Sequence, residues 1–293
     1  MILPDLILTS RQNQVWAESG IDSLKNCVNK QHFKSYPHPV EYQYNSRGFR
    51  DDTWPSNLEE SIWCIGDSFT VGIGSTLEHT WVNLLQKKLH QRCINISMDA
   101  ASNSWIARKA IRILTTVQPR LLIIHWSYFF RDELADSTLT DEDRRLHHVE
   151  DISESKQLEM FATCLKSVEQ QKHATHIIHS FIPNGPPVYD RHRAEKEWNT
   201  VKGSSWPNLP GSIVEFNDLS TYIKTELQNF DRYDIFRNFA EYTSTFETIL
   251  DSVVAIPELE QIDRARDGHH YDILTATNFV EQLATVISAL PVH

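Results

Sequence analysis

Runs of apolar residues alternate along the chain with segments in which apolar residues recur every three or four positions. The continuous runs are typical of strands that are covered on both faces, and they lie at residues 61–65, 93–96, 120–126, 175–181 and 251–256. The periodic segments predict amphipathic helices at residues 78–91, 103–117, 157–171, 220–230 and 275–290. This alternation predicts a three-layer αβα fold of the α/β class, with a parallel, flavodoxin-like sheet between two layers of helices.

The pattern is weaker at the start of the chain and in two later stretches. Residues 1–40 show no sustained period and are closed by Pro37 and Pro39, so we expect an N-terminal extension that lies on a main domain of residues 41–293. The acidic stretch 132–154 is predicted to be a loop, and the irregular stretch 184–212 a long insert. Long inserts in compact α/β domains often cover a substrate.

Composition and charge narrow the class of protein. The chain has 293 residues, of which 40% are hydrophobic, so it can bury a substantial core and is not expected to be disordered. Its formal net charge of −11 opposes binding to nucleic acid or to an anionic membrane surface. No window approaches the roughly 20 apolar residues of a membrane-spanning helix. The N-terminus carries Asp5 and lacks the basic start of a secretory signal, so we expect a cytoplasmic protein.

Nothing in the sequence predicts a metal or cofactor site. The cysteines are irregularly spaced and form no Cys-x-x-Cys pair: Cys27, Cys64, Cys93 and Cys164. His176 and His179 lie three apart on a predicted strand, which puts their side chains on opposite faces. Gly72 and Gly74 lack the lysine and the spacing of a phosphate-binding loop. We therefore expect no cofactor.

Ser68 is the candidate nucleophile. It follows the predicted strand 61–65 in the sequence Gly66-Asp67-Ser68, at a turn where free backbone N–H groups can hold an oxyanion. A serine hydroxyl needs a base, and Asp267-Gly268-His269-His270 offers one, with Asp267 fixing the tautomer of His270. His269 competes with His270 for this role. The other interpretation is structural: Ser68 caps a helix, and the Asp267 turn lies on the surface.

These two end blocks, Gly66-Asp67-Ser68 and Asp267-x-x-His270, resemble the SGNH/GDSL hydrolase superfamily. The lead-in Asn45-Ser46-Arg47-Gly48-Phe49-Arg50 and the pair Thr80-Trp81 are similar to one branch of that superfamily, and the likeness spans roughly residues 41–290. The stretch that begins Trp126-Ser127 resembles a variant among phage-encoded and bacterial O-acetylesterase-like members. If the protein is phage-encoded, association with the virion is the alternative to a cytoplasmic location.

The resemblance also implies an oxyanion hole, in which this sequence departs from the usual pattern. The N–H groups of Ser68 and Ala100 correspond to the first two donors, with alanine where the family usually has glycine. The third block usually supplies an asparagine, which is missing here. Either Asn103 or Ser127 replaces that donor, or the hole consists of backbone groups alone, or catalysis is weakened.

We therefore expect a serine esterase that acts on a small-molecule or carbohydrate ester, with an O-acetyl carbohydrate as the preferred substrate. Candidate substrate-binding residues are Asp67, Arg131, Trp198 and Trp206. Arg131 would bind an anionic group unless an acidic neighbour pairs with it. Two alternatives remain: an acyltransferase with the same triad, and a catalytically silent carbohydrate-binding protein, which the missing asparagine would explain.

Overall fold

The core of the protein is one parallel β-sheet. The computed structural model describes residues 9–27, 31–128, 131–133, 147–148, 154–182, 205–208, 212–215, 254–256, 259 and 261–291. The sheet has five strands, in the spatial order β4 (Cys93–Asn95), β3 (Ile62–Gly66), β5 (Leu121–Trp126), β8 (His176–Phe181) and β11 (Val254–Ile256). All four pairings are parallel. By position along the chain this order is second, first, third, fourth, fifth, which confirms the predicted flavodoxin-like sheet.

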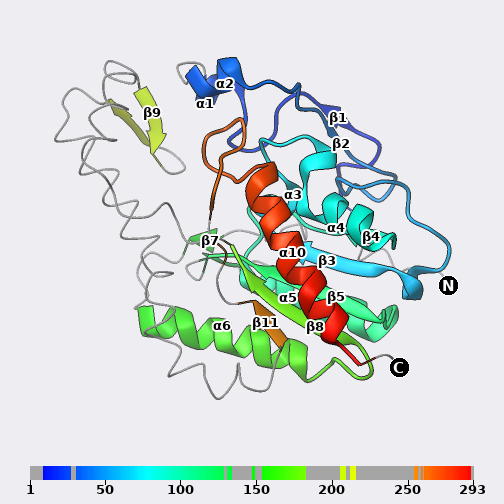
Figure 1. The fold of residues 1–293 in the computed structure, drawn as a ribbon. Coiled ribbons are helices and arrows are strands. Elements are labelled where there is room, and N and C mark those ends of the chain that lie inside the picture. The colour runs from blue at the N-terminus through cyan, green and yellow to red at the C-terminus, as the bar shows by residue number, and fades with distance from the viewer. Residues whose placement is uncertain are drawn as a thin grey trace.

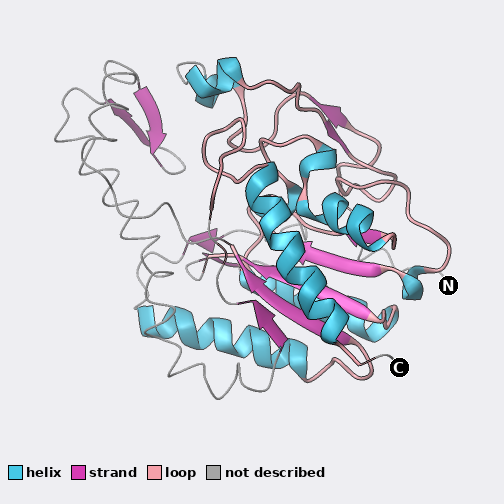
Figure 2. Cartoon of the chain, in the orientation of Figure 1, coloured by secondary structure: helices cyan, strands magenta, loops and turns pink. Residues whose placement is uncertain are grey.

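Helices cover both faces of this sheet (Figures 1 and 2). The crossover from β3 to β4 runs in the opposite direction to those from β4 to β5 and from β5 to β8, so right-handed connections place their helices on opposite faces. Accordingly, α4 (Trp81–Leu89) packs against α10 (Ile273–Ala289), while α5 (Asn103–Thr116) packs against α6 (Glu154–Glu169). These bounds lie within a few residues of the predicted ones.

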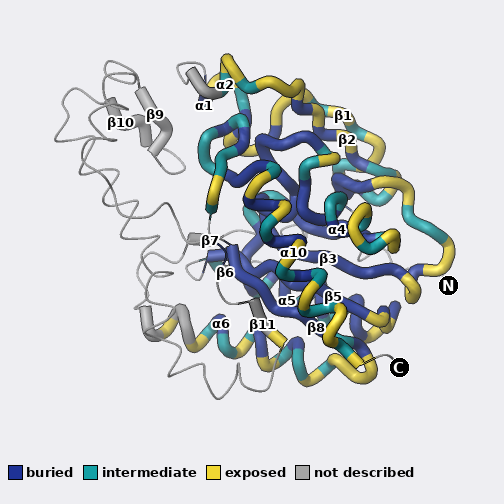
Figure 3. Tube along the Cα trace, in the orientation of Figure 1, coloured by how far each residue is buried: buried dark blue, intermediate teal, exposed yellow. Residues whose placement is uncertain are grey.

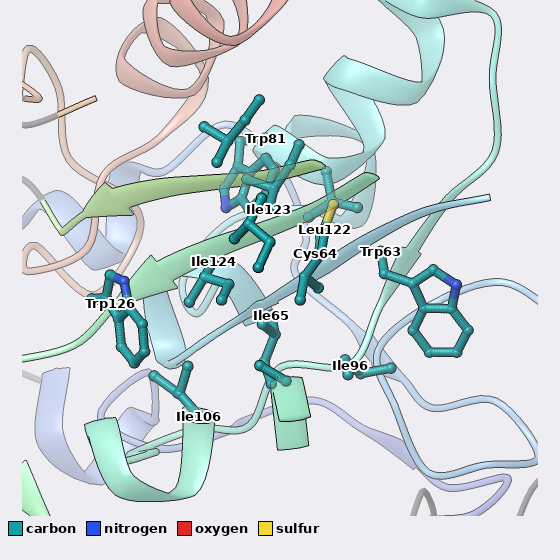
Figure 4. Packing of buried hydrophobic residues seen from close by; sticks show 14 of the residues in the cluster. Trp63, Cys64, Ile65, Trp81, Ile96, Ile106, Leu122, Ile123, Ile124 and Trp126 are labelled. Atoms are coloured by element: carbon teal, nitrogen blue, oxygen red, sulfur yellow. The ribbon is translucent and has the colours of Figure 1, made fainter. Parts of the chain in front are cut away.

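The strands are apolar throughout because both of their faces are covered. Every residue of β3 and β5 is buried, whereas the outward sides of α6 and α10 are partly exposed (Figure 3). Trp81 of α4 and Ile106 of α5 approach the strands from opposite sides (Figure 4). The buried indole of Trp63 donates to Leu58 O at 2.9 Å. That of Trp126 donates to His179 Nδ1 at 3.0 Å, so both polar groups are satisfied.

The N-terminal segment is joined to the main domain by a strand pair. β1 (Val15–Trp16) pairs antiparallel with β2 (Tyr42–Gln43), and the short helices α1 (Leu24–Cys27) and α2 (Gln31–Ser35) follow β1. Two 3₁₀ turns, η2 (Leu58–Glu60) and η3 (Leu77–His79), precede β3 and α4. The proposed division at residue 40 therefore falls between two paired strands.

Parts of the predicted loops contain short strands. In the acidic stretch, β7 (His147–His148) pairs with β6 (Arg131–Asp132), and in the predicted insert β9 (Ser205–Asn208) pairs antiparallel with β10 (Ser212–Glu215). Trp206 lies in β9, whereas Trp198 and the predicted helix 220–230 lie outside the described residues. Among the described helices, none is both long and apolar enough to span a membrane.

Candidate active site

Ser68 lies where the first strand of the sheet turns into a helix. β3 ends at Gly66, Asp67 caps α3 (Ser68–Val71), and Ser68 is the first helical residue. The cap is made by the Asp67 carboxylate, which accepts from Phe69 N at 3.0 Å. Gly66 is required here because a Cβ would lie 2.2 Å from Thr70 Oγ1 and 2.8 Å from His125 O. Since Asp67 is the cap, the Ser68 hydroxyl is not needed for that structural role.

A single chain of hydrogen bonds joins Ser68 to the loop before α10. His270 Nε2 lies 2.8 Å from Ser68 Oγ, although the residues are 202 positions apart in sequence. His270 Nδ1 lies 2.5 Å from Asp267 Oδ2, and the other oxygen of Asp267 accepts from His269 N at 2.8 Å and from His270 N at 3.0 Å. An ionised Asp267 can only accept, so Nδ1 carries the proton and Nε2 is the acceptor for the serine hydroxyl.

The two titratable partners stabilise each other's charged forms. Burial alone would raise the pKa of Asp267, but the charge and hydrogen bond of His270 hold that pKa well below its usual range. Burial alone would lower the pKa of His270, but the charge and hydrogen bond of Asp267 raise it above its usual value. Asp267 therefore remains ionised at neutral pH and makes His270 a stronger base.

His269 has different neighbours. Its ring centroid lies 5.7 Å from that of Phe69, and its carbonyl accepts from Gln261 Nε2 at 2.9 Å. The side chain within hydrogen-bonding distance of Ser68 Oγ is that of His270. Of the two adjacent histidines, the structure therefore brings His270 to the serine.

The oxyanion donors predicted from the sequence fall into two groups. Ala100 follows β4 with φ +60°, so it adopts the left-handed conformation that a glycine would favour. Within the described part of the chain, the backbone N–H groups of Ser68 and Ala100 have no hydrogen-bond acceptor. Asn103 and Ser127 are engaged elsewhere, and their predicted role as replacement donors does not fit the structure.

The reason is that Asn103 holds the loop after β5. Its Nδ2 donates to Ser127 O and Tyr128 O, both at 3.1 Å, and its Oδ1 accepts from Ser127 N at 2.8 Å. The Ser127 hydroxyl donates to Asp67 Oδ2 at 2.6 Å. Both N–H groups of the Asn103 amide and the single hydroxyl proton of Ser127 are thus occupied, so neither side chain fits its predicted role as a donor.

Arg131 and Asp67 form a buried ion pair. Arg131 Nη1 lies 2.9 Å from Asp67 Oδ2 and 3.0 Å from Ser127 Oγ, and its guanidinium stacks on the Tyr128 ring. Asp67 is fully buried, and Arg131 is largely so. Arg131 therefore has the acidic neighbour that argues against a role in binding an anionic substrate. Asp67 has a structural partner at each carboxylate oxygen rather than a surface that faces a substrate.

Sequence reasoning missed two structural supports of this site. Arg50 is fully buried, and its hydrogen bonds hold the loop after α3 in place. Its guanidinium donates to four carbonyls, those of Glu41, Val71, Gly72 and Ser75. The motif similarity at residues 45–50 could have drawn attention to Arg50. The second, Asp22, forms an ion pair with Arg266, the residue before Asp267, and no sequence motif surrounds it. Across the described residues, no cluster of three or more histidine, cysteine or acidic side chains could hold a metal ion.

Comparisons with known proteins found structural likenesses at low sequence identity. The chain matches no family model and no curated protein. It is similar to the crystal structure of TesA, with 13% identity, a TM-score of 0.44, and coverage of 78% of this chain and 98% of that one. It is also similar to a family two carbohydrate esterase from Clostridium thermocellum in complex with cellohexaose, with 14% identity, a TM-score of 0.43, and coverage of 81% and 66%.

A GDSL-like lipase from Bacteroides thetaiotaomicron is a third similar structure. It shares 11% identity at a TM-score of 0.37, over 82% of this chain and 93% of that one.

Proposed function

We propose that the protein is a serine esterase in which Ser68 is the nucleophile, His270 the general base and Asp267 the residue that orients it. The observation that carries the proposal is the unbroken hydrogen-bond chain from Ser68 Oγ through His270 to Asp267. A second observation supports it: β3 and β5 flank the point where the strand order reverses, the usual ligand crevice of such sheets. Ser68 follows β3 and therefore lies at that crevice.

The reaction begins when Ser68 Oγ attacks the ester carbonyl while its proton passes to His270 Nε2. The negative charge that develops on the carbonyl oxygen is held by the N–H groups of Ser68 and Ala100. When the tetrahedral intermediate collapses, His270 returns the proton to the leaving alcohol, and an acyl-serine remains. Water then attacks the acyl-serine with His270 again as base, which releases the acid and restores Ser68.

Asn103 and Ser127 are engaged by other groups and do not serve as side-chain oxyanion donors, which lowers the expected rate. One such donor contributes about 3 kcal/mol of transition-state stabilisation, or about a hundredfold in rate. We therefore expect a slower esterase than one with three donors, rather than an inactive protein. This expectation distinguishes the proposal from a silent carbohydrate-binding protein, for which Ser68 would have no effect on turnover.

An O-acetyl group on a carbohydrate is the proposed substrate, chiefly because of the motif resemblance. The pairing of Arg131 with Asp67 supports a neutral acyl group such as acetyl, since this guanidinium is already neutralised. Trp206 in β9 remains a proposed substrate contact. An acyltransferase would use the same triad, and added saccharide would then divert acyl groups from water.

Aryl-acetate hydrolysis tests the proposal. Replacing Ser68 or His270 by alanine should lower kcat by at least about a thousandfold, because either change interrupts the nucleophile–base pair. His269→Ala is the matched control, since it removes the adjacent imidazole and should keep most of the activity. Equal rates for the wild type, Ser68→Ala and His270→Ala would refute the triad.

A further inference from the structure

Asp22 is a buried carboxylate in the N-terminal segment. It has no exposed surface and lies in a tight turn whose ends, Ser19 and Asp22, exchange backbone hydrogen bonds at 3.1 and 3.0 Å. The Arg266 guanidinium forms a bidentate ion pair with Asp22, from Nε to Oδ1 at 2.9 Å and from Nη2 to Oδ2 at 2.6 Å. The Tyr42 hydroxyl donates to the same Oδ2 at 2.6 Å. Both oxygens of Asp22 are thus occupied by partners from the main domain.

Arg266 and Tyr42, the two partners of Asp22, both also form hydrogen bonds with Gly74. The backbone N–H of Arg266 donates to Gly74 O at 2.9 Å, and Gly74 N–H donates to the Tyr42 hydroxyl oxygen at 2.8 Å. Arg266 immediately precedes Asp267, while Gly74 lies in the loop after α3, the helix that begins at Ser68. Asp22 therefore connects the segment that carries the general base to the segment that carries the nucleophile.

Gly74 is also where these two segments touch. Its φ is +80°, and a Cβ there would lie 2.8 Å from Ala265 Cβ and 3.1 Å from Asp267 Cγ. The carbonyl of Ser68 accepts from Gly72 N at 3.0 Å and from Ile73 N at 3.1 Å, which ties the same loop back to Ser68. A displacement of Gly74 would therefore change the spacing between Ser68 and the Asp267 loop.

We propose that Asp22 is a positioning residue for the esterase reaction. Through Arg266 and Tyr42 it sets the distance between the Ser68 turn and the Asp267–His270 loop. The inference rests on the proposed function, and it makes the N-terminal segment part of the active-site framework rather than an extension lying on it. Asp22 contacts none of the three proposed catalytic side chains, so its effect is transmitted through the backbone on either side of Gly74.

Asp22→Asn tests this idea because it keeps the shape of the side chain and removes the charge that Arg266 binds. The matched control is Glu169→Gln, which removes a carboxylate from its pairs with His179 and Lys172 between α6 and β8. Tyr42→Phe is a milder second variant that removes only the hydroxyl between Asp22 and Gly74. Each protein would be assayed for kcat and KM with an aryl acetate, for its pH–rate profile and for its thermal midpoint, beside Ser68→Ala.

We expect Asp22→Asn to lower kcat about 10- to 100-fold with little change in KM, since a displacement of about 1 Å at the reacting groups has an effect of this size. Tyr42→Phe should lower kcat in the same direction, and Glu169→Gln should keep the wild-type kcat even where its thermal midpoint falls. A folded Asp22→Asn protein with wild-type kcat would overturn the inference. If Asp22→Asn does not fold, wild-type kcat in Tyr42→Phe would overturn it instead. Equal rates for the wild type and Ser68→Ala would refute the esterase proposal itself.

Discussion

Replacing Ala100 by glycine should stabilise the protein and leave the proposed chemistry intact. Ala100 has φ +60°, a conformation in which its Cβ crowds the following carbonyl at a cost of roughly 1–2 kcal/mol. Glycine removes that cost but adds freedom to the unfolded chain, which offsets roughly 0.5–1 kcal/mol. The balance is a gain of about 0.5–1 kcal/mol in the free energy of unfolding.

Chemical denaturation at constant temperature, with a thermal scan beside it, measures this gain. The matched control is Ala284→Gly inside α10, where the same change should cost about 1 kcal/mol because the residue is helical. Since the proposed oxyanion donor at residue 100 is a backbone N–H, kcat with an aryl acetate should change by less than about threefold. A loss of stability in Ala100→Gly that equals the loss in Ala284→Gly would refute the strained-backbone explanation.

Three further perturbations probe the charged groups. Asp267→Asn should lower kcat/KM by about ten-thousandfold, and because Asp267 raises the pKa of His270, the acid limb of the residual pH–rate profile should move to lower pH; an unmoved limb would contradict the pairing. Burial raises the pKa of Asp51 from 3.8 to about 6, so the folded protein favours the protonated carboxyl. The stability that this proton binding adds is fully present below pH 3.8 and is lost as the pH rises through 6. In urea titrations, the unfolding free energy of Asp51→Asn should therefore rise by up to about 3 kcal/mol relative to that of the wild type as the pH goes from acidic to neutral. A difference between the two proteins that does not change with pH would exclude the raised pKa of Asp51. Arg131→Met leaves the Asp67 carboxylate buried without its cation and should cost about 3 kcal/mol in the same titrations; a loss below about 1 kcal/mol would mean that the pair behaves like an exposed one.

The sheet and its flanking helices were predictable because burial on both faces leaves a strong mark on the sequence. The run Leu121–Trp126 is apolar except for His125, whose imidazole is buried, bonds to Ser180 Oγ at 2.9 Å and has its pKa lowered by burial to about 3. Helix bounds were less accurate, as at α4, where Thr80 is the cap and the helix begins at Trp81, three residues after the predicted start at residue 78. A cap depends on local side-chain geometry, which the hydrophobic period does not specify.

Some parts of the candidate site could likewise be predicted from the sequence and others could not. Ser68 and His270 could be paired from sequence because each lies in a recognisable block at the end of a strand or the start of a helix. The partners of Asn103 and Ser127 could not, because the carbonyl and carboxylate groups that engage them are 24 and 60 residues away. Asp22 was missed for the same reason, since its ion-pair partner is 244 residues distant.

The packing of α10 against α4 bears on the order in which the parts of the proposed active site form during folding. Ser68 belongs to the first strand–helix unit of the sheet, whereas His270 lies in the loop directly before α10, the helix that packs on α4. A chain made from its N-terminus would therefore form the turn that bears Ser68, the proposed nucleophile, long before it acquired His270, the proposed base, and contacts of such long range form slowly. In a refolding experiment, the recovery of the proposed esterase activity would report the docking of the last helix, while tryptophan burial in the sheet would report an earlier event.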